Sequence, residues 1–321
     1  MIELRFWAIT VSTLIATGMA ALLSACSGAG SQSVISTLPS ASLRAPSPLV
    51  HRVTQASSGP MDLFVVENDE NAVEILANKK WKNTGKSITQ SIDGPDGDWE
   101  DAEGNLYVAN ESGPNVTEYD TNSKDSPIYT YTGFTEPVDV RTDSGGNVYV
   151  ADYFGSDVAE YKQQTDTPVA TCEPGGFVEG VAIDTKGDVF VGFYDGLFSY
   201  VAEYAGGLKG CNNTNLGVSV NEPAGMVFDK KNDLILCDPG VPAVDVIDPP
   251  YSSVSGTLGS GYSNPLHVTL NAKNNQAYVA DSGTDKVYVL SYPAGKLEAT
   301  LGTSNGISDA WSAVDGQNYV P

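Results

Sequence analysis

The sequence predicts an all-β protein: a six-bladed β-propeller of four-stranded blades, closed by a C-terminal strand that joins the first blade. Three observations predict it: an apolar strand recurs, a polar turn precedes most copies, and the spacing is nearly constant. The complete copies begin at Leu63, Leu106, Val148, Val189, Leu234 and Ala277, and a stub follows at 317–320. Complete copies begin 41 to 45 residues apart. Such a period is typical of propellers, in which each unit buries its apolar faces against its neighbours.

Each unit is predicted to begin with an innermost strand that follows a Pro-containing lead-in, as in 136–140 and 222–226. This strand ends at an Asp or Asn, whose side chain accepts backbone N–H groups of a tight turn in which Gly takes a positive φ. Four of these turns begin at Asp101, Asp143, Asp184 and Asp229. The second strand is the recurring apolar strand. It is apolar on successive residues because neighbouring blades cover both of its faces.

The third and outermost strands of each unit are more polar. Third strands are expected at 73–75, 116–119, 158–161, 201–204, 244–246 and 287–289. The copy at 201–204 comes two residues late, so the loop at 194–200 carries a small insertion. Alternation along these strands leaves a Glu or Thr on a solvated side, as an outer strand requires. The outermost strands are the least regular and are expected at 128–131, 169–172 and 297–300.

The number of blades follows from the unpaired ends of the repeat array. Six second strands are complete, but the first has no innermost strand before it, because a polar, flexible segment precedes it. Residues 310–315 supply the missing strand, and pairing them with 63–67 closes the ring and removes a free sheet edge. We therefore expect six blades. A seven-bladed ring with a truncated last blade is the alternative.

The first 58 residues indicate where the protein is located. An apolar stretch at 6–23 is followed by Ser24-Ala25-Cys26, a pattern that predicts a secretory signal. Residues 23–26 resemble a bacterial lipobox, which implies that Cys26 is lipidated and becomes the mature N-terminus; an ordinary cleaved signal is the alternative. By analogy with lipoprotein sorting, Ser27 favours a lipid-anchored protein of the bacterial cell envelope, at the outer membrane or cell surface.

Three segments follow from this assignment. Residues 1–25 are the lipoprotein signal peptide, 26–58 carry the lipidated Cys and a flexible tether, and 59–321 form the propeller. The tether is rich in Ser, Ala and Pro and has no periodic apolar pattern, so it cannot offset the entropy of becoming ordered. Its length holds the propeller clear of the bilayer.

The composition excludes several classes of partner and site. Acidic residues outnumber basic ones 40 to 17, for a net charge of −23, so nucleic acid and anionic lipid head groups are not expected partners. Membrane contact is expected only through the lipid anchor. The acidity serves either solubility or cation binding. With two histidines and no CxxC pair, a zinc site of the usual Cys/His kind is excluded.

Two cysteines occupy similar late positions in successive repeats. Cys172 and Cys211 both follow an expected outer strand. In an oxidising compartment they can form a disulfide, provided that their Cα atoms come within about 7 Å. Without that approach they stay free. Cys237 ends an apolar strand and is expected to be a buried small hydrophobe.

Stretches 137–140, 146–152 and 158–161, with their counterparts in other units, resemble the NHL-repeat type of six-bladed propeller. The resemblance spans about residues 60–321. It implies the fold, while NHL-like propellers include scaffolds, sensors and a few lyases and hydrolases. The Gly-His and Trp-Asp pairs of WD repeats are absent from the sequence.

Ligands of small propellers usually lie at one mouth of the central channel, which the beginnings of the innermost strands surround. Aligning these segments places two sets of residues at successive levels. One set is Asp96, Val138, Glu179, Ala224, Leu266 and Ala310; the next is Gly97, Asp139, Gly180, Gly225, His267 and Trp311. Glu136, Glu222 and Asn264 lie further out. The candidate ligand-binding residues are Asp96, Asp139, Glu179, Glu222, Asn264, His267 and Trp311.

Two kinds of chemistry are open to these candidates. His267 is the candidate catalytic acid or base, although a structural histidine is the plainer interpretation. Oxygen ligands of this kind suit Ca²⁺, and the gluconolactonase-like propellers hold a divalent ion with a comparable set, which implies Glu179, Asp139 and Asn264 here. Amidating-lyase propellers are also similar, but they hold zinc with histidines that this chain lacks.

The leading hypothesis is a noncatalytic, lipid-anchored binding or scaffold module for a protein, peptide or glycan. It is expected to be a monomer and to need no cofactor. The alternative is a divalent-metal-dependent hydrolase or lyase with its site at the channel mouth, for which calcium is the expected ion. Asp152, Asp238 and Asp281 recur at matched positions after the second strands. Because catalytic groups are not normally copied into every blade, we expect a turn role for these three.

Overall fold

The computed structural model describes residues 62–77, 80–121, 125–316 and 320. The expected signal peptide, Cys26 and the tether lie outside the described residues, as does most of the stub at 317–320. Among the described residues, no helix has both the length and the apolar character needed to cross a membrane.

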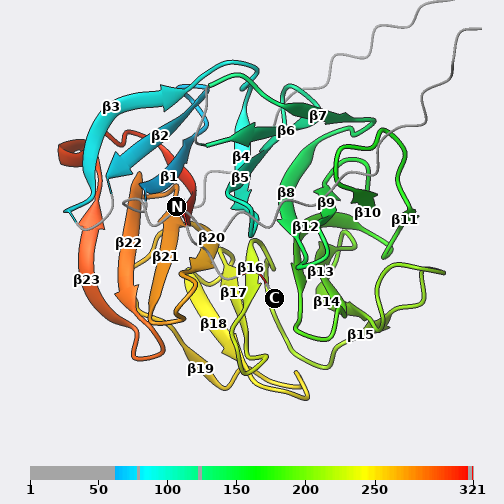
Figure 1. Cartoon of the computed structure of the whole chain (residues 1–321). Helices are drawn as coiled ribbons and strands as arrows, with labels where there is room; N and C mark the ends of the chain where they lie inside the picture. The colour runs from blue at the N-terminus through cyan, green and yellow to red at the C-terminus, as the bar shows by residue number, and fades with distance from the viewer. Residues whose placement is uncertain (1–61, 78–79, 122–124, 317–319, 321) are drawn as a thin grey trace, which may run out of the picture. The chain divides into compact units, whose positions relative to one another are not determined.

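The described chain folds into six antiparallel sheets of four strands that follow one another around a ring (Figure 1). Blade 1 consists of β24 (Ala310–Asp315), β1 (Asp62–Glu67), β2 (Ala72–Ala77) and β3 (Lys82–Ile88); blade 2 of β4 (Pro95–Glu100), β5 (Asn105–Asn110), β6 (Asn115–Asp120) and β7 (Tyr129–Thr132); and blade 3 of β8 (Pro137–Thr142), β9 (Asn147–Asp152), β10 (Asp157–Lys162) and β11 (Ala170–Cys172). Blade 4 consists of β12 (Phe177–Ile183), β13 (Val189–Tyr194), β14 (Ser199–Tyr204) and β15 (Thr214–Asn215); blade 5 of β16 (Met226–Phe228), β17 (Leu234–Asp238), β18 (Ala243–Ile247) and β19 (Gly256–Thr257); and blade 6 of β20 (Pro265–Leu270), β21 (Gln276–Asp281), β22 (Lys286–Ser291) and β23 (Lys296–Leu301). A short 3-10 helix, η2 (Thr303–Asn305), precedes β24. The six-bladed prediction is confirmed, and the seven-bladed alternative is wrong.

The ring is closed by the strand that the sequence predicts. β24 pairs antiparallel with β1, with Leu63 opposite Asp315 and Val65 opposite Ala313. In Figure 1 the blade that holds β1, β2 and β3 consequently lies beside β22 and β23, although these strands come from opposite ends of the chain. Pairing β24 with β1 removes the sheet edge that β1 would otherwise expose.

The second strands are apolar on successive residues because each lies between two neighbouring blades. In β13, Val189 and Val191 belong to a core cluster shared with blade 3. The side chain between them, Phe190, belongs to the next cluster, where its ring lies 4.7 Å from that of Phe228 and 5.0 Å from that of Tyr251 in blade 5. The core is therefore divided into layers between blades, as the continuous apolar runs predict.

The hairpins at the far end of the innermost strands have the predicted chemistry. Asp143 Oδ1 accepts hydrogen bonds from the backbone N–H groups of Gly145 and Asn147, both at 2.9 Å, and Gly146 has a φ of +75°. The same pair of bonds recurs at Asp101, Asp184 and Asp229. Four copies of one turn fix the register of the two inner strands in blades 2 to 5.

A disulfide joins blades 3 and 4. Cys172 ends β11 and Cys211 lies between β14 and β15; their sulfur atoms are 2.11 Å apart and their Cα atoms 5.3 Å apart. The approach of the two Cα atoms satisfies the condition set out from the sequence. Cys237, in β17, is fully buried in the core between blades, as predicted for a small hydrophobe.

The disulfide is expected to stabilise the fold measurably. Replacing both partners, Cys172→Ala with Cys211→Ala, should lower the free energy of unfolding by about 2–4 kcal/mol, because the crosslink restricts the unfolded chain. Urea unfolding with and without a reducing agent measures the effect. The reductant should destabilise the wild-type protein and leave the double variant unchanged. An equal response of the two proteins would contradict the prediction.

Candidate functional site

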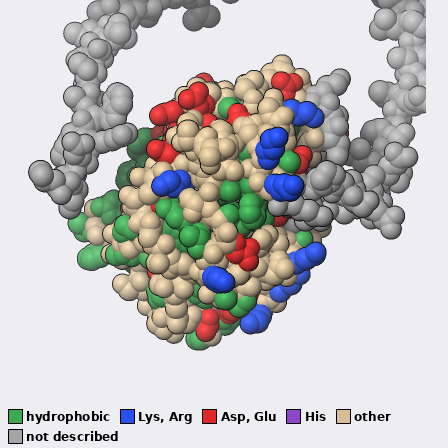
Figure 2. Space-filling model, turned by 90° about the vertical axis from the view of Figure 1, so that its left-hand side faces the viewer, with side chains coloured by type: hydrophobic (Ala, Val, Ile, Leu, Met, Phe, Trp, Pro, Cys, Tyr) green, Lys and Arg blue, Asp and Glu red, His purple; other side chains and the backbone are tan. Residues whose placement is uncertain are grey.

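A pocket of about 220 Å³ lies at the channel mouth, the end of the ring where the innermost strands begin and the second strands end. Five carboxyl side chains line it: Asp96, Glu111, Glu136, Glu179 and Glu222. Val138, Tyr153, Ala224, Leu266 and His267 complete the lining. Neither lysine nor arginine is among these lining residues. Figure 2 shows lysine side chains on a flank of the ring, on the side that carries β3 and β23 in Figure 1.

Irregularities in the innermost strands aim several of these side chains at the pocket. In blades 2, 3, 4 and 6 the pairing of the innermost strand with the second strand shifts register at the mouth end. The residues within these shifts include Asp96, Val138, Glu179 and Leu266, which all line the pocket. A β-bulge redirects a side chain in this way. The sequence alignment placed these four residues at one level.

The recurring Asp residues at the ends of the second strands hold the lead-in segments in place. Asp152 accepts hydrogen bonds from the backbone N–H groups of Thr135 and Glu136, both at 2.7 Å. Asp238 and Asp281 make the equivalent pairs of bonds to Asn221 and Glu222, and to Ser263 and Asn264. Asp152 and Asp281 also have the predicted turn role, because their Oδ1 atoms accept hydrogen bonds from the backbone N–H groups of Gly155 and Gly283 in the turns that follow. The bonds to the lead-in segments fix Glu136 and Glu222 at the mouth.

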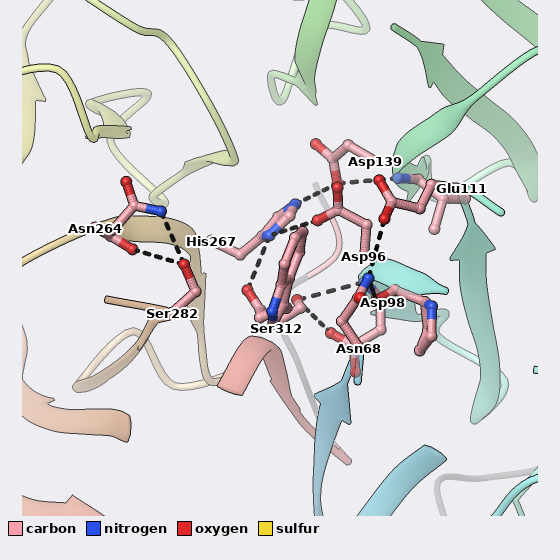
Figure 3. A network of polar contacts seen from close by, with 12 residues as sticks. Asn68, Asp96, Asp98, Glu111, Asp139, Asn264, His267, Ser282 and Ser312 are labelled. Carbon is pink, nitrogen blue, oxygen red and sulfur yellow. Dashed lines mark hydrogen bonds and ion pairs between the residues drawn. The ribbon is translucent and has the colours of Figure 1, made fainter. Parts of the chain in front are cut away.

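Two residues of the pocket lining, Glu111 and Tyr153, are not predicted from the sequence, and a third, Glu136, is predicted near the mouth but not as a ligand-binding residue. Glu111 and Tyr153 directly follow Asn110 and Asp152, at the beginning of the loops that join the second and third strands. The residue that directly follows a second strand is therefore expected to lie at the mouth, and this position in the repeat could have identified Glu111 and Tyr153 from the sequence. Its counterpart in blade 1, Asn68, donates a 3.2 Å hydrogen bond to Glu111 Oε1 (Figure 3).

His267 is buried against the pocket and is held in one tautomer. Its Nδ1 lies 3.1 Å from the backbone oxygen of Trp311. A carbonyl oxygen can only accept, so Nδ1 carries the proton and Nε2 is an acceptor. Nε2 is buried and has no hydrogen-bond partner. Asp139 Oδ1 is 3.7 Å from Nε2, which is beyond hydrogen-bond distance.

The environment keeps His267 neutral. Burial lowers its pKa to about 3, and the nearby Arg141 guanidinium acts in the same direction. A general base is most effective when its pKa lies near the working pH. His267 is therefore poorly suited to acid or base catalysis at neutral pH, and well suited to accept a hydrogen bond.

The carboxyl groups of the pocket hold their protons to unusually high pH. Burial, followed by repulsion from Glu222 and Asp238, raises the pKa of Glu179 to about 8. Burial and the charges of Glu111 and Asp152 raise the pKa of Glu136 to about 7. Asp96 is raised well above its ordinary pKa, first by burial and then by Glu111, Asp139 and Glu136. A positive charge placed among these groups would relieve their mutual repulsion.

The remaining candidates are not among the residues that line the pocket. Asp139 is fully buried, forms an ion pair with Arg141, and accepts hydrogen bonds from the backbone N–H groups of Val140 and Val181. Asn264 donates to Ser282 Oγ at 2.8 Å (Figure 3). The indole N–H of Trp311 donates to Asp309 Oδ1 at 2.9 Å.

These positions bear on the expected metal ligands. Of Glu179, Asp139 and Asn264, only Glu179 lines the pocket. Across the described residues, no group of three or more His, Cys, Asp and Glu side chains is arranged to hold a metal ion. The structure thus brings together Asp96, Glu179, Glu222 and His267 from the predicted set, and places Asp139, Asn264 and Trp311 in other contacts.

Comparisons with known proteins identify the fold and no family. Neither the protein-family models nor the curated proteins contain a match to this chain. Among solved structures, a chain from the crystal structure of a nidogen/laminin complex is similar, with a TM-score of 0.66 and 15% identity over 80% of this chain and 98% of that chain. A protein of unknown function from Bacteroides caccae gives a TM-score of 0.64 and 13% identity over 80% of this chain and 99% of that one. At these identities the likeness shows a shared propeller fold.

Proposed function

We propose that this chain is a noncatalytic binding module of the bacterial cell envelope, whose channel mouth binds a positively charged group of a protein or peptide partner. The proposal depends mainly on one observation: five carboxyl groups and neither lysine nor arginine line the mouth pocket. The proposal includes an NHL-type repeat, a lipid on Cys26, a tether that presents the ring as a monomer, and a place at the outer membrane or cell surface.

An organic cation suits the donors and acceptors of the pocket. An ammonium group carries three hydrogen-bond donors and no acceptor. The pocket offers carboxyl oxygens together with His267 Nε2, which is a buried acceptor without a partner. Tyr153 adds an aromatic ring, whose face attracts cations. The volume of about 220 Å³ accommodates a side chain rather than a folded segment.

The nature of the partner follows from the charge and is supported by the fold. A neutral glycan would leave the pKa values of the carboxyl groups raised, whereas a lysine or arginine side chain would stabilise their ionised forms. One structurally similar chain comes from a nidogen/laminin complex, so propellers of this kind occur in protein complexes. We therefore favour a protein or peptide over a glycan.

The rival proposal, a calcium-dependent hydrolase or lyase, has weaker support. Its metal ligands are distributed over separate contacts, with Asp139 bound to Arg141 and Asn264 to Ser282. Its candidate acid or base, His267, has a pKa of about 3. These placements favour an organic cation over a divalent ion as the occupant of the mouth.

Titration calorimetry with Nα-acetyl-lysine amide at low salt tests the proposal. The purified protein should bind this probe and should not bind the same molecule with its side-chain amine acetylated, because acetylation removes the charge. Glu179→Gln should weaken binding at least tenfold, about 1.4 kcal/mol. Glu103→Gln, at an exposed carboxyl in the hairpin between β4 and β5, is the matched control and should bind like wild type.

Two results would contradict the proposal. One is equal binding of the charged and the acetylated probe. The other is tight binding of Ca²⁺ that Glu179→Gln abolishes while the lysine probe does not bind, which would favour the metal-dependent enzyme.

A further inference from the structure

Half of the mouth is bordered by exposed apolar side chains, which we call the apolar rim. It consists of Phe154, Leu197, Phe198 and Val241, which are 57%, 81%, 65% and 49% exposed. They lie on the loops that join the second and third strands of the consecutive blades 3, 4 and 5. Most surface hydrophobic residues occur singly, so this grouping on one side of the mouth calls for an explanation.

The other half of the mouth is polar. The equivalent loops of blades 1, 2 and 6 are residues 68–71, 111–114 and 282–285, with the sequences Asn-Asp-Glu-Asn, Glu-Ser-Gly-Pro and Ser-Gly-Thr-Asp. The two halves thus differ in sequence at matched positions of one repeat. The apolar character is a property of three particular loops and not of the repeat itself.

The most exposed part of the apolar rim is held in a defined shape. Asp195 Oδ1 accepts hydrogen bonds from the backbone N–H groups of Leu197 and Phe198, both at 2.8 Å, and the Asp195 N–H donates to the Phe198 carbonyl at 3.0 Å. This turn belongs to the loop that carries the insertion. Because the backbone of this turn is already ordered, binding at its two apolar side chains does not carry the entropy cost of ordering the loop backbone.

The apolar rim is continuous with the acidic pocket. The ring of Phe154 lies 5.0 Å from that of Tyr153 and 5.9 Å from that of Phe177. Tyr153 lines the pocket and stacks on Phe177 at 5.2 Å. Phe177 in turn pairs across the sheet with Tyr194, the residue before the turn at 195–198. Aromatic contacts therefore lead from the pocket wall to Phe154 and Phe177, and the strand pairing places the exposed turn next to Phe177.

We propose that the apolar rim and the acidic pocket form one docking surface for a protein segment in which a lysine or arginine lies next to an apolar residue. The basic side chain enters the pocket and its apolar neighbour covers Leu197 and Phe198. This inference rests on the proposed function and specifies the partner. Charge complementarity selects this occupant: the pocket is lined by five carboxyl groups and by no lysine or arginine, and the buried Nε2 of His267 is an acceptor without a partner. A cation supplies hydrogen-bond donors together with the opposite charge.

Two capped tripeptides test the inference: acetyl-Gly-Lys-Gly amide and acetyl-Leu-Lys-Leu amide, titrated into the purified protein. The wild-type protein should bind the Leu peptide at least tenfold more tightly, because burying a Leu side chain is worth more than a tenfold change in affinity. Leu197→Ser with Phe198→Ser should abolish that ratio and leave the affinity for the Gly peptide within twofold. Leu297→Ser, 52% exposed on β23, is the matched control and should keep the ratio.

The outcomes separate this inference from the proposed function. If both peptides bind with equal affinity, or if the rim variant keeps the wild-type ratio, the inference is overturned while the lysine pocket stands. If neither peptide binds more tightly than its side-chain-acetylated form, both proposals fail. A concentration-dependent dimer that the rim variant dissolves, measured by light scattering, would assign the apolar rim to a second copy of the chain and overturn the inference as well.

Discussion

Replacing Arg141 with Met should lower the free energy of unfolding by about 3–5 kcal/mol, the typical cost of breaking a buried ion pair from one side. Arg141 is the only arginine among the described residues, and it is 2% exposed. Its guanidinium pairs with Asp139, donates to the carbonyl oxygens of Val140 and Met226, and lies 4.7 Å from the centre of the Trp99 ring. One side chain therefore joins the innermost strands of blades 2, 3 and 5.

The loss should depend on pH in a defined direction. Burial raises the pKa of Asp139 to about 6, and Arg141 opposes that rise. Without the guanidinium the pKa rises further, so Asp139 keeps its proton in the folded variant at pH values where the unfolded chain has lost it. The folded variant then binds more protons than the unfolded one, and its stability falls as pH rises. The deficit of Arg141→Met should be smaller at pH 5 than at pH 8.

Urea unfolding of a double-mutant cycle measures both effects. Arg141→Met, Asp139→Asn and the double variant are compared with wild type at pH 5 and pH 8. The double variant should recover part of the loss, because no unpaired charge is left behind. The free energy of unfolding of Arg141→Lys should lie between those of wild type and Arg141→Met, because lysine keeps the positive charge but lacks the planar guanidinium group and its several N–H donors. A loss below about 1 kcal/mol, or one independent of pH, would contradict this account.

The repeat array and its closure could be predicted from the sequence because they follow from local chemistry. The Asp turns and apolar second strands fix the register of each hairpin, and the first strand, β1, has no partner before it in the sequence. Only a strand from the far end could cover that edge, which is where β24 lies. The level that holds Asp96 and Glu179 was likewise predictable, because equivalent positions of a repeat occupy equivalent places in the ring.

The residues that line the pocket could be predicted less completely from the sequence, for two physical reasons. Glu111 and Tyr153 lie on loops, where the strand period gives no information, and only the assembled ring brings them to the mouth. Asp139 shares an aligned level with His267, but its side chain is committed to Arg141, two residues further along the same strand. A register shift between Pro137 and Asp139 separates residues that line the pocket from those that turn inward. Sequence spacing alone does not reveal such a bulge.

The fold should be markedly more stable at pH 5 than at pH 9, by several kcal/mol. Burial and neighbouring carboxyl groups raise the pKa of Glu100 to about 9 and that of Glu179 to about 8. Burial also raises the pKa of Asp98 to about 7. Each of these groups keeps its proton in the folded state to a higher pH than in the unfolded chain, so the free energy of unfolding falls as pH rises from about 4.5 to about 9. One pKa unit of a buried group corresponds to about 1.4 kcal/mol.

The variant Glu179→Gln separates the loss of stability at high pH from the binding function that we propose for Glu179. Gln has nearly the same shape and no proton to lose, so the variant should unfold at a higher temperature than wild type at pH 9, and the two should be similar at pH 5. Glu103→Gln, exposed and remote from the mouth, should follow wild type throughout. Thermal unfolding from pH 5 to pH 9, with and without Nα-acetyl-lysine amide, measures both the pH dependence of stability and the binding of the probe. A wild-type protein as stable at pH 9 as at pH 5 would contradict the prediction. If Glu179→Gln is more stable than wild type at high pH and no longer binds Nα-acetyl-lysine amide, then Glu179 lowers the stability of the fold and is needed for binding. Such a loss of stability in exchange for function is expected at a binding site built from carboxyl groups that repel one another.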